Sequence, residues 1–277
     1  MLKSNFILLK FITIIFLFIS CNAEDENSLE NLNKGLFPNI IISTSSPPAL
    51  WPPSLLELNI KISDSFTNQD VESVIEMSNK WNQATDYNPT IFGLSSANRT
   101  ANLDYPNIES YKKDSEFGIY LKKKWFDNVS QSALAVTYSS GYQVNAGTPN
   151  EYIELFSADI IFNNDRYEFG HDQVAGEFDF ASIVIHELGH FAGLEHYTGI
   201  EDSVMKPRIK SKDVRRDLYP IDTGNIRALY SGYTNIKGMY LGDLPEPQKG
   251  DEVTIIHEYL PGGICLHYLN GIFYHIH

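Results

Sequence analysis

The pattern of apolar and polar residues changes period along this chain, and the changes predict its secondary structure. Apolar and polar residues alternate in residues 56–62, which is typical of a strand with one buried face. In residues 68–85 apolar side chains recur at helical spacing, so we expect an amphipathic helix with Trp81 in the core. Three further apolar stretches are predicted strands of the same sheet, at residues 117–121, 133–139 and 152–162.

The C-terminal region, residues 233–277, contains three more alternating stretches, at 253–260, 264–269 and 272–277. The last two are separated by Asn270-Gly271, a strong signal for a two-residue hairpin turn. We therefore expect a small three-stranded meander. Because three strands alone are barely stable, this appendage should pack on the preceding domain. We interpret its histidines as imidazoles on an exposed strand face: His257, His267, His275 and His277.

Residues 1–20 are typical of an export signal. Lys3 and Lys10 make the start positive, and the apolar run of residues 11–19 is too short to span a bilayer. The run ends in Phe18-Ile19-Ser20-Cys21, which resembles a bacterial lipobox. This predicts a lipid on Cys21, a membrane partner through that anchor, and a bacterial cell-envelope lipoprotein of the outer membrane or cell surface. An ordinary signal peptide, giving a secreted protein, is the alternative.

Residues 21–53 have the composition of a flexible tether. The stretch begins with three acidic residues, and residues 43–53 contain four prolines and four serine or threonine residues. We expect one globular domain at residues 54–232, because 43% hydrophobic and 13% aromatic residues suffice for a core. The formal net charge of -14 excludes nucleic acid as a partner. We expect a monomer.

One stretch, residues 186–196, carries the candidate chemistry. His186 and His190 are four residues apart, so on a helix both imidazoles lie on one face and can bind one zinc ion. Glu187 is offset from that row and can reach a metal-held water as general base. Gly193 can adopt a positive φ and turn the chain, which brings His196 in as third ligand. Three protein ligands leave a position for water, as in catalytic zinc sites.

These eleven residues resemble the H-E-x-x-H-x-x-G-x-x-H signature of metzincin peptidases. Met205-Lys206-Pro207 resembles the methionine turn of the matrixins within that group, and residues 222–230 resemble their closing helix. The resemblance implies an α+β metzincin-like fold: a twisted, mixed five-stranded sheet with an antiparallel edge strand and an active-site helix. It further implies a zinc endopeptidase acting on protein or peptide substrates, with Met205 as an apolar floor under the metal.

The resemblance also suggests where a substrate binds. Residues 157–163 resemble the matrixin strand that forms the upper edge of the cleft, where an extended substrate adds to the sheet. The loop at residues 208–220 should form part of the specificity pocket. This chain departs from the family in having Tyr197 where matrixins carry serine after the third histidine, and in lacking a pro-segment cysteine before residue 54. We therefore expect an enzyme that is active as made, with Cys265 as a core residue.

Other interpretations remain open. The chain could be a surface-anchored binding or adhesion protein with a catalytically weak metalloprotease core, which would not need Glu187. It could also be a metal-dependent hydrolase of non-peptide amides. A structural calcium site is a further candidate, because a predicted turn offers three oxygen side chains: Asn163, Asn164 and Asp165.

Overall fold

The structure is a computed structural model, and it describes residues 47–93, 98–113, 116–172, 176–239, 249–261, 266–270 and 272–276. The predicted export signal, Cys21, Cys265 and most of the predicted tether lie outside these residues. Among the helices in these ranges, none combines the length and the hydropathy that a membrane span requires.

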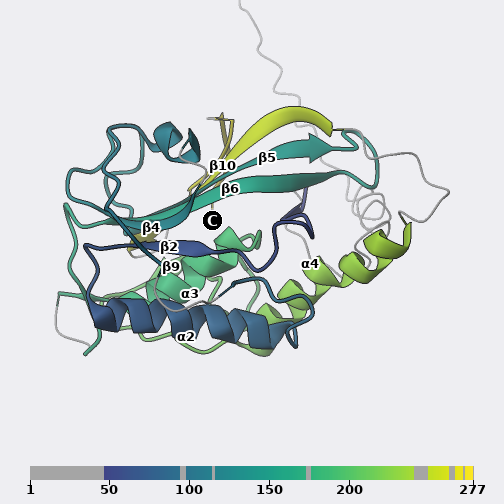
Figure 1. The fold of residues 1–277 in the computed structure, drawn as a ribbon. Helices are drawn as coiled ribbons and strands as arrows, with labels where there is room; N and C mark the ends of the chain where they lie inside the picture. Colours follow the sequence, from purple (N-terminus) through teal and green to yellow (C-terminus); the bar gives the residue numbers. More distant parts are fainter. Residues whose placement is uncertain are drawn as a thin grey trace, which may run out of the picture.

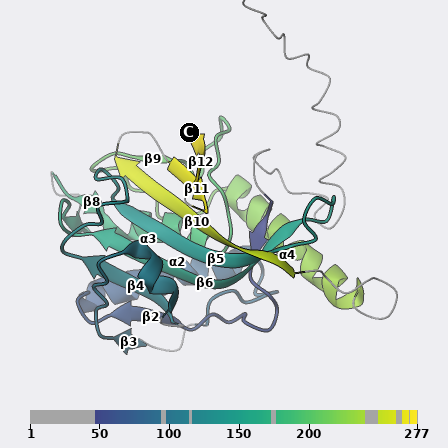
Figure 2. The same cartoon turned by 90° about the horizontal axis from the view of Figure 1, so that it is seen from above.

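Ten strands of the described chain form one twisted sheet, with five of them in the order β3-β2-β4-β6-β5 (Figures 1 and 2). The first four strands run parallel to one another, and β5 is antiparallel to β6. This confirms the predicted mixed sheet with one antiparallel strand, although the full sheet is larger than five strands. These five strands are β2 (Ile60–Ser63), β3 (Arg99–Thr100), β4 (Phe117–Lys122), β5 (Ala135–Val144) and β6 (Tyr152–Asn163).

Two helices, α2 (Asn68–Ala84) and α3 (Phe180–Phe191), lie on one face of the sheet (Figure 1). The predicted helix at 68–85 corresponds to α2, which begins at a capping box: Thr67 accepts from the Asp70 backbone, and Asp70 accepts from that of Thr67. A longer helix, α4 (Pro220–Met239), follows the candidate site and crosses the boundary predicted at residue 232. A short 3₁₀ helix, η1 (Ile108–Lys113), contributes to the opposite face.

Apolar side chains form a core on each face of the sheet. The larger core lies between the sheet and helices α2 and α3, and it includes Trp51, Trp81 and Phe191, all fully buried. The smaller core is an aromatic cluster on the other face, around Tyr111 of η1 and Tyr138 of β5. Helix α3, which carries the candidate site, packs within the larger core.

The globular core begins earlier than the predicted residue 54. Strand β1 (Ala49–Leu50) pairs with Ile153 and Glu154 of β6, and both of its side chains are buried. Trp51 donates a hydrogen bond from its indole nitrogen to the Phe191 carbonyl at the end of α3, at 2.7 Å. Residues 49–51 are therefore part of the domain, because they satisfy a helix-terminal carbonyl and fill the core.

The predicted C-terminal meander is present, but it is not a separate appendage. Strands β10 (Lys249–Pro261), β11 (Leu266–Leu269) and β12 (Ile272–Ile276) pair in antiparallel order. Strand β10 also pairs antiparallel with β5 along most of its length, and the two strands lie side by side in both views (Figures 1 and 2). The meander thus continues the main sheet, because β10 covers the edge that β5 would otherwise expose.

This arrangement corrects the predicted edge of the cleft. The strand that contains residues 157–163 is β6, and it lies inside the sheet between β5 and β4. Among the five central strands the edge next to the zinc motif belongs to β5. The prediction rested on a resemblance of residues 157–163 to a family strand, and a local resemblance does not show which strand lies at the edge of the sheet.

Candidate metal centre

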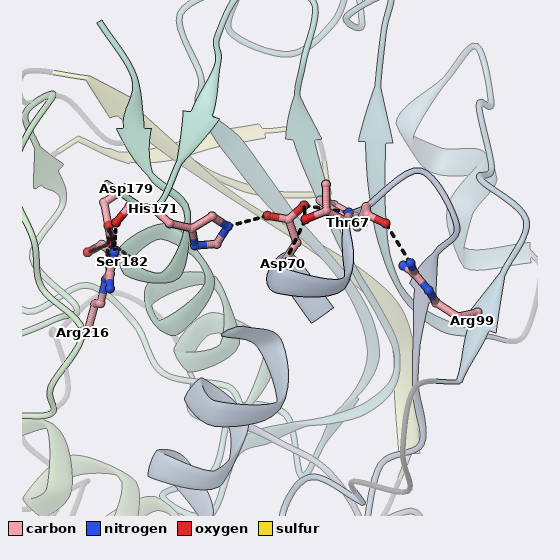
Figure 3. A network of polar contacts seen from close by, with 8 residues as sticks. Thr67, Asp70, Arg99, His171, Asp179, Ser182 and Arg216 are labelled. Atoms are coloured by element: carbon pink, nitrogen blue, oxygen red, sulfur yellow. Dashed lines mark hydrogen bonds and ion pairs between the residues drawn. The ribbon is translucent and has the colours of Figure 1, made fainter. Parts of the chain in front are cut away.

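Helix α3 carries the zinc motif and is held at its first turn by a polar network (Figure 3). Asp179 caps the helix by accepting from the Ser182 backbone at 2.9 Å. Arg216 donates to both carboxylate oxygens of Asp179, and to the His171 carbonyl at 2.8 Å. The Nε2 atom of His171 in turn lies 2.8 Å from Oδ1 of Asp70, in the first turn of α2. The network therefore joins the first turns of both helices.

The electrostatics of this cap favour an ionised carboxylate. Burial alone would raise the pKa of Asp179, but hydrogen bonds from Arg216 and Ser182, together with the guanidinium charge, hold it below its usual value. His171 therefore belongs to a structural network around the helix start. The short parallel pair β7 (Phe169–Gly170) and β8 (Phe178–Asp179) leads directly into this cap.

The three histidines of the motif converge on one point. The Nε2 atoms of His186, His190 and His196 are each 3.0 Å from the other two, and all three side chains are buried. His186 and His190 come from successive turns of α3, as their spacing predicts. Among the described residues, these three are the group of potential ligands that could hold a metal ion.

The tautomers of two of these histidines fit a cation. The Nδ1 atom of His186 lies 2.7 Å from the Val204 carbonyl, and that of His190 lies 2.7 Å from the Leu194 carbonyl. A carbonyl only accepts, so each Nδ1 carries the proton and each neutral Nε2 presents a bare lone pair. Lone pairs 3.0 Å apart repel each other unless a cation lies between them. Two nitrogens bound at about 2.0–2.1 Å to one tetrahedral zinc lie about 3.3 Å apart, close to the spacing here.

Gly193 turns the chain so that His196 reaches the same point. Its φ is +96°, and an added Cβ would lie 2.0 Å from the carbonyl oxygen of Ala49. The Gly193 backbone also donates to the His190 carbonyl at 2.8 Å, closing the helix. The predicted positive φ is confirmed, and the neighbouring strand β1 adds a steric reason for glycine that the motif alone did not reveal.

Glu187 is buried between α3 and β5. One carboxylate oxygen accepts a hydrogen bond from the Thr137 hydroxyl of β5, and the other, Oε1, has no partner in the described structure. Burial raises the pKa of Glu187 to about 8, and a cation held by the adjacent histidines would act in the opposite direction. Thr137 is a site residue that sequence reasoning missed, because a single strand threonine carries no local signal.

Met205 lies directly against α3. An added Cβ on Gly189, which precedes His190 in the helix, would lie 2.2 Å from the Met205 sulfur. Asp222 at the start of α4 holds this turn: it accepts from the Ser203 hydroxyl and from the Val204 backbone at 3.0 Å. Since Val204 also accepts from His186, Asp222 supports a histidine indirectly. The motif did not predict this support.

Two side chains of β10 cover the histidine cluster, against the prediction of exposed imidazoles. His257 stacks on His190 with ring centroids 4.1 Å apart, and Tyr259 stacks on His186 at 3.7 Å. Both side chains are buried. His257 Nε2 also lies 3.2 Å from the carboxylate of Glu195, the residue before the third histidine. For His267, His275 and His277 the structure describes no side chains.

The side chains suggested for calcium have protein partners. Asn163 donates to the Ala133 carbonyl at 2.7 Å, and Asn164 donates to that of Tyr167 at 3.3 Å. Asp165 accepts from the Trp125 backbone at 3.1 Å. These contacts, made by the amide nitrogens of the asparagines and by one Asp165 oxygen, brace the turn after β6, while Asn163 Oδ1 has no partner in the described structure. The structure does not support calcium there.

Comparisons with known proteins agree with the geometry. A sequence model of the family described as Matrixin matches residues 66–231. The chain is 38% identical over 60 residues to Metalloendoproteinase 5-MMP of Arabidopsis thaliana, covering 22% of this chain and 16% of the relative. It is 35% identical over 65 residues to Metalloendoproteinase 2-MMP of the same plant, covering 24% and 17%. The chain thus aligns with about a sixth of the length of these relatives.

Proposed function

Because the chain belongs to the matrixin family, we propose that it is a zinc-dependent endopeptidase that hydrolyses peptide bonds with Glu187 as general base. The observation that carries this proposal is the buried triangle of Nε2 atoms, 3.0 Å on each side, with a partly unpaired carboxylate on the next residue of the same helix. His186, His190 and His196 are the proposed ligands. Protein or peptide chains are the proposed substrates.

The histidines would hold zinc through Nε2, with tautomers already selected by the Val204 and Leu194 carbonyls. When bound at such a site, zinc lowers the pKa of a coordinated water to about 7 and polarises a carbonyl. Met205 is the proposed apolar floor of the site, packed against the helix between the first two ligands.

Glu187 has the position and hydrogen bonding of a proton carrier. Thr137 holds one oxygen of the carboxylate, which leaves Oε1 to take the proton from the attacking water. The same carboxyl can then give that proton to the leaving amine as the peptide bond breaks. Burial between α3 and β5 limits the rotamers of Glu187, so the transfer has a fixed direction.

This arrangement favours catalysis over a binding protein with a weak metalloprotease core. A non-catalytic descendant would gain nothing from a buried carboxylate with an unpaired oxygen, since such a group costs about 1–3 kcal/mol of stability or more. An enzyme can retain a group with this stability cost when the group takes part in the reaction.

The proposal is tested by metal analysis and one substitution. We expect one zinc per chain after purification without added metal, and peptidase activity that chelators remove. Glu187→Gln should keep zinc and fold while losing about 10²–10⁴-fold in turnover of fluorescein-labelled casein. His196→Ala is the matched control, since it should lose metal as well as activity. Absence of zinc uptake, or an unchanged rate in Glu187→Gln, would refute the assignment.

We also propose the lipid anchor on Cys21, which rests on the sequence motif. Cys21→Ser should release the protein from membranes of a bacterial host, and fatty-acid labelling should mark only the wild type. An unlabelled wild type would instead support ordinary secretion.

A further inference from the structure

Strand β10 lies between two segments of the proposed active site. On one side it pairs antiparallel with β5, from Tyr259 opposite Ala135 to Lys249 opposite Val144. On the other side its end pairs parallel with β9 (Arg208–Ile209), in the loop after Met205 that should form part of the specificity pocket. An extended peptide bound to a sheet edge and a pocket loop would take the same path.

The inward face of β10 is fitted to the metal centre. Tyr259 lies nearly parallel to the His186 ring, at an interplanar angle of 11°, and His257 lies parallel to the His190 ring within 5°. Two of the three proposed ligands are therefore covered by aromatic rings at van der Waals distance. The contact between His257 and Glu195 fixes the strand beside the third ligand.

The backbone of β10 occupies the place where a substrate strand would bind. In the described structure β5 has β6 on one side and β10 on the other. An extended substrate cannot add to β5 until β10 leaves, because each strand edge forms one ladder. The outer edge of β10 is itself paired with β11 from Ile255 to Glu258.

On the basis of the proposed function, we infer that β10 is an internal competitor of the substrate and holds the enzyme latent until it is displaced. Nine residues, 240–248, separate α4 from β10 in the sequence. A segment on a short linker has an effective concentration on the order of mM, about 10³ times that of a free peptide at 1 μM. A substrate of equal intrinsic affinity is therefore excluded.

This inference revises the expectation of an enzyme that is active as made. That expectation relied on the missing pro-segment cysteine and on a tail that stays clear of the cleft. The observed tail crosses the metal centre through His257 and Tyr259, so latency requires no thiol. Displacement of β10, by a partner or by proteolysis before it, would expose the edge of β5.

A pair of double variants tests the inference. His257→Ala/Tyr259→Ala removes the two rings that cover the ligands. Thr254→Ala/Ile256→Ala is the matched control, because it trims the same strand on the alternate positions and leaves those rings in place. We expect the first variant to cleave fluorescein-labelled casein at least tenfold faster than wild type, and the control to match wild type.

A binding measurement provides a readout that is independent of turnover. In a Glu187→Gln background, a labelled peptide of the β10 sequence, Lys249–Pro261, reports whether the slot is free. We expect His257→Ala/Tyr259→Ala to bind this peptide at least tenfold more tightly than the parent. Equal affinity in both proteins would overturn the inference.

A reversible lock covers the case in which the double variant fails to fold. Ser140 and Thr254 lie opposite each other, so cysteines at both positions can form a cross-strand disulfide that retains β10. The lock is made with Cys21 and Cys265 replaced by serine. We expect the oxidised form to lose the residual activity that the latent wild type shows when β10 opens transiently, and tris(2-carboxyethyl)phosphine to restore that residual rate.

The outcomes separate this inference from the proposed function. If the oxidised lock cleaves casein as fast as the reduced form, β10 does not inhibit, while the peptidase assignment stands. If no form cleaves casein although each holds zinc, the proposed function fails and the inference fails with it. A loss of activity in His257→Ala/Tyr259→Ala, with fold retained, would make β10 part of the catalytic site and overturn its inhibitory role.

Discussion

Replacing Gly189 by alanine tests how closely the methionine turn packs under the zinc helix. A Cβ at this position would lie 2.2 Å from the Met205 sulfur and 3.0 Å from the Trp81 ring. Trp81 cannot move away freely, because its indole nitrogen donates to the Ile185 carbonyl at 2.9 Å. Met205 is 2% exposed, so its side chain must shift within the core rather than into solvent.

Two opposing effects determine how far Gly189→Ala changes the free energy of unfolding. Alanine gains about 0.5–1 kcal/mol over glycine in a helix interior. Overpacking a filled core costs about 1–3 kcal/mol. Gly224→Ala isolates the first effect, because Gly224 lies in α4 and an added Cβ there would meet nothing within 4 Å. The two variants should therefore differ by the packing cost alone, about 1–3 kcal/mol.

Thermal unfolding of the zinc-loaded protein measures this difference. At about 2–4 °C per kcal/mol for a domain of this size, Gly189→Ala should melt about 2–12 °C below Gly224→Ala. Met205→Ala should reduce the penalty of Gly189→Ala in a double-mutant cycle, because it removes the clashing sulfur. A melting temperature of Gly189→Ala equal to or above that of Gly224→Ala would refute the packing of Met205 under the helix.

Three further predictions concern the residues that position the site. Thr137→Val removes the hydrogen bond to Glu187 and should lower kcat/KM about 10–150-fold, as expected for loss of about 1.5–3 kcal/mol. Thr137→Ser keeps the hydroxyl and should stay near wild type. Equal rates in the two variants would show that Thr137 does not position Glu187. Asp222→Asn loses one acceptor for the turn that holds His186, so competition with a chelator should show zinc bound about 10–100-fold more weakly, and unchanged affinity would contradict this support. Asp179→Asn keeps a capping side chain but loses the charge. Because the folded pKa of Asp179 lies below its unfolded value, its stabilisation is complete above about pH 4 and is lost as pH falls through the folded pKa. The gap in melting temperature between wild type and variant should therefore shrink below pH 4, and a constant gap would contradict the lowered pKa.

The elements that could be predicted from sequence are those specified by near neighbours. Helix α2 begins where Thr67 and Asp70 form a capping box, three residues apart, and the observed end is one residue from the predicted one. Likewise the three histidines and Gly193 fall within eleven residues, so helical spacing places His186 beside His190 and the turn at Gly193 brings His196 to them.

The supporting contacts could not be predicted because they join distant parts of the chain. Thr137 and Glu187 are 50 residues apart, and Arg216 and Asp179 are 37 apart. Each is a common surface residue type whose role appears only once the strands and helices are packed. The same reason explains Trp51, which a proline-rich composition assigned to a tether although its ring lies in the core.

The alternation of apolar residues along β10 indicates that His257 is buried. Val253, Ile255 and Tyr259 share its parity along the strand, so the apolar row that must be buried includes this histidine. A buried imidazole requires a polar partner. For a side chain in this row, the partner must belong to the part of the protein on which that face of β10 packs. Here the partner is Glu195, inside the zinc motif. Alternation alone could not name that partner, because it defines which face of a strand is buried but not the sheet edge on which the strand lies.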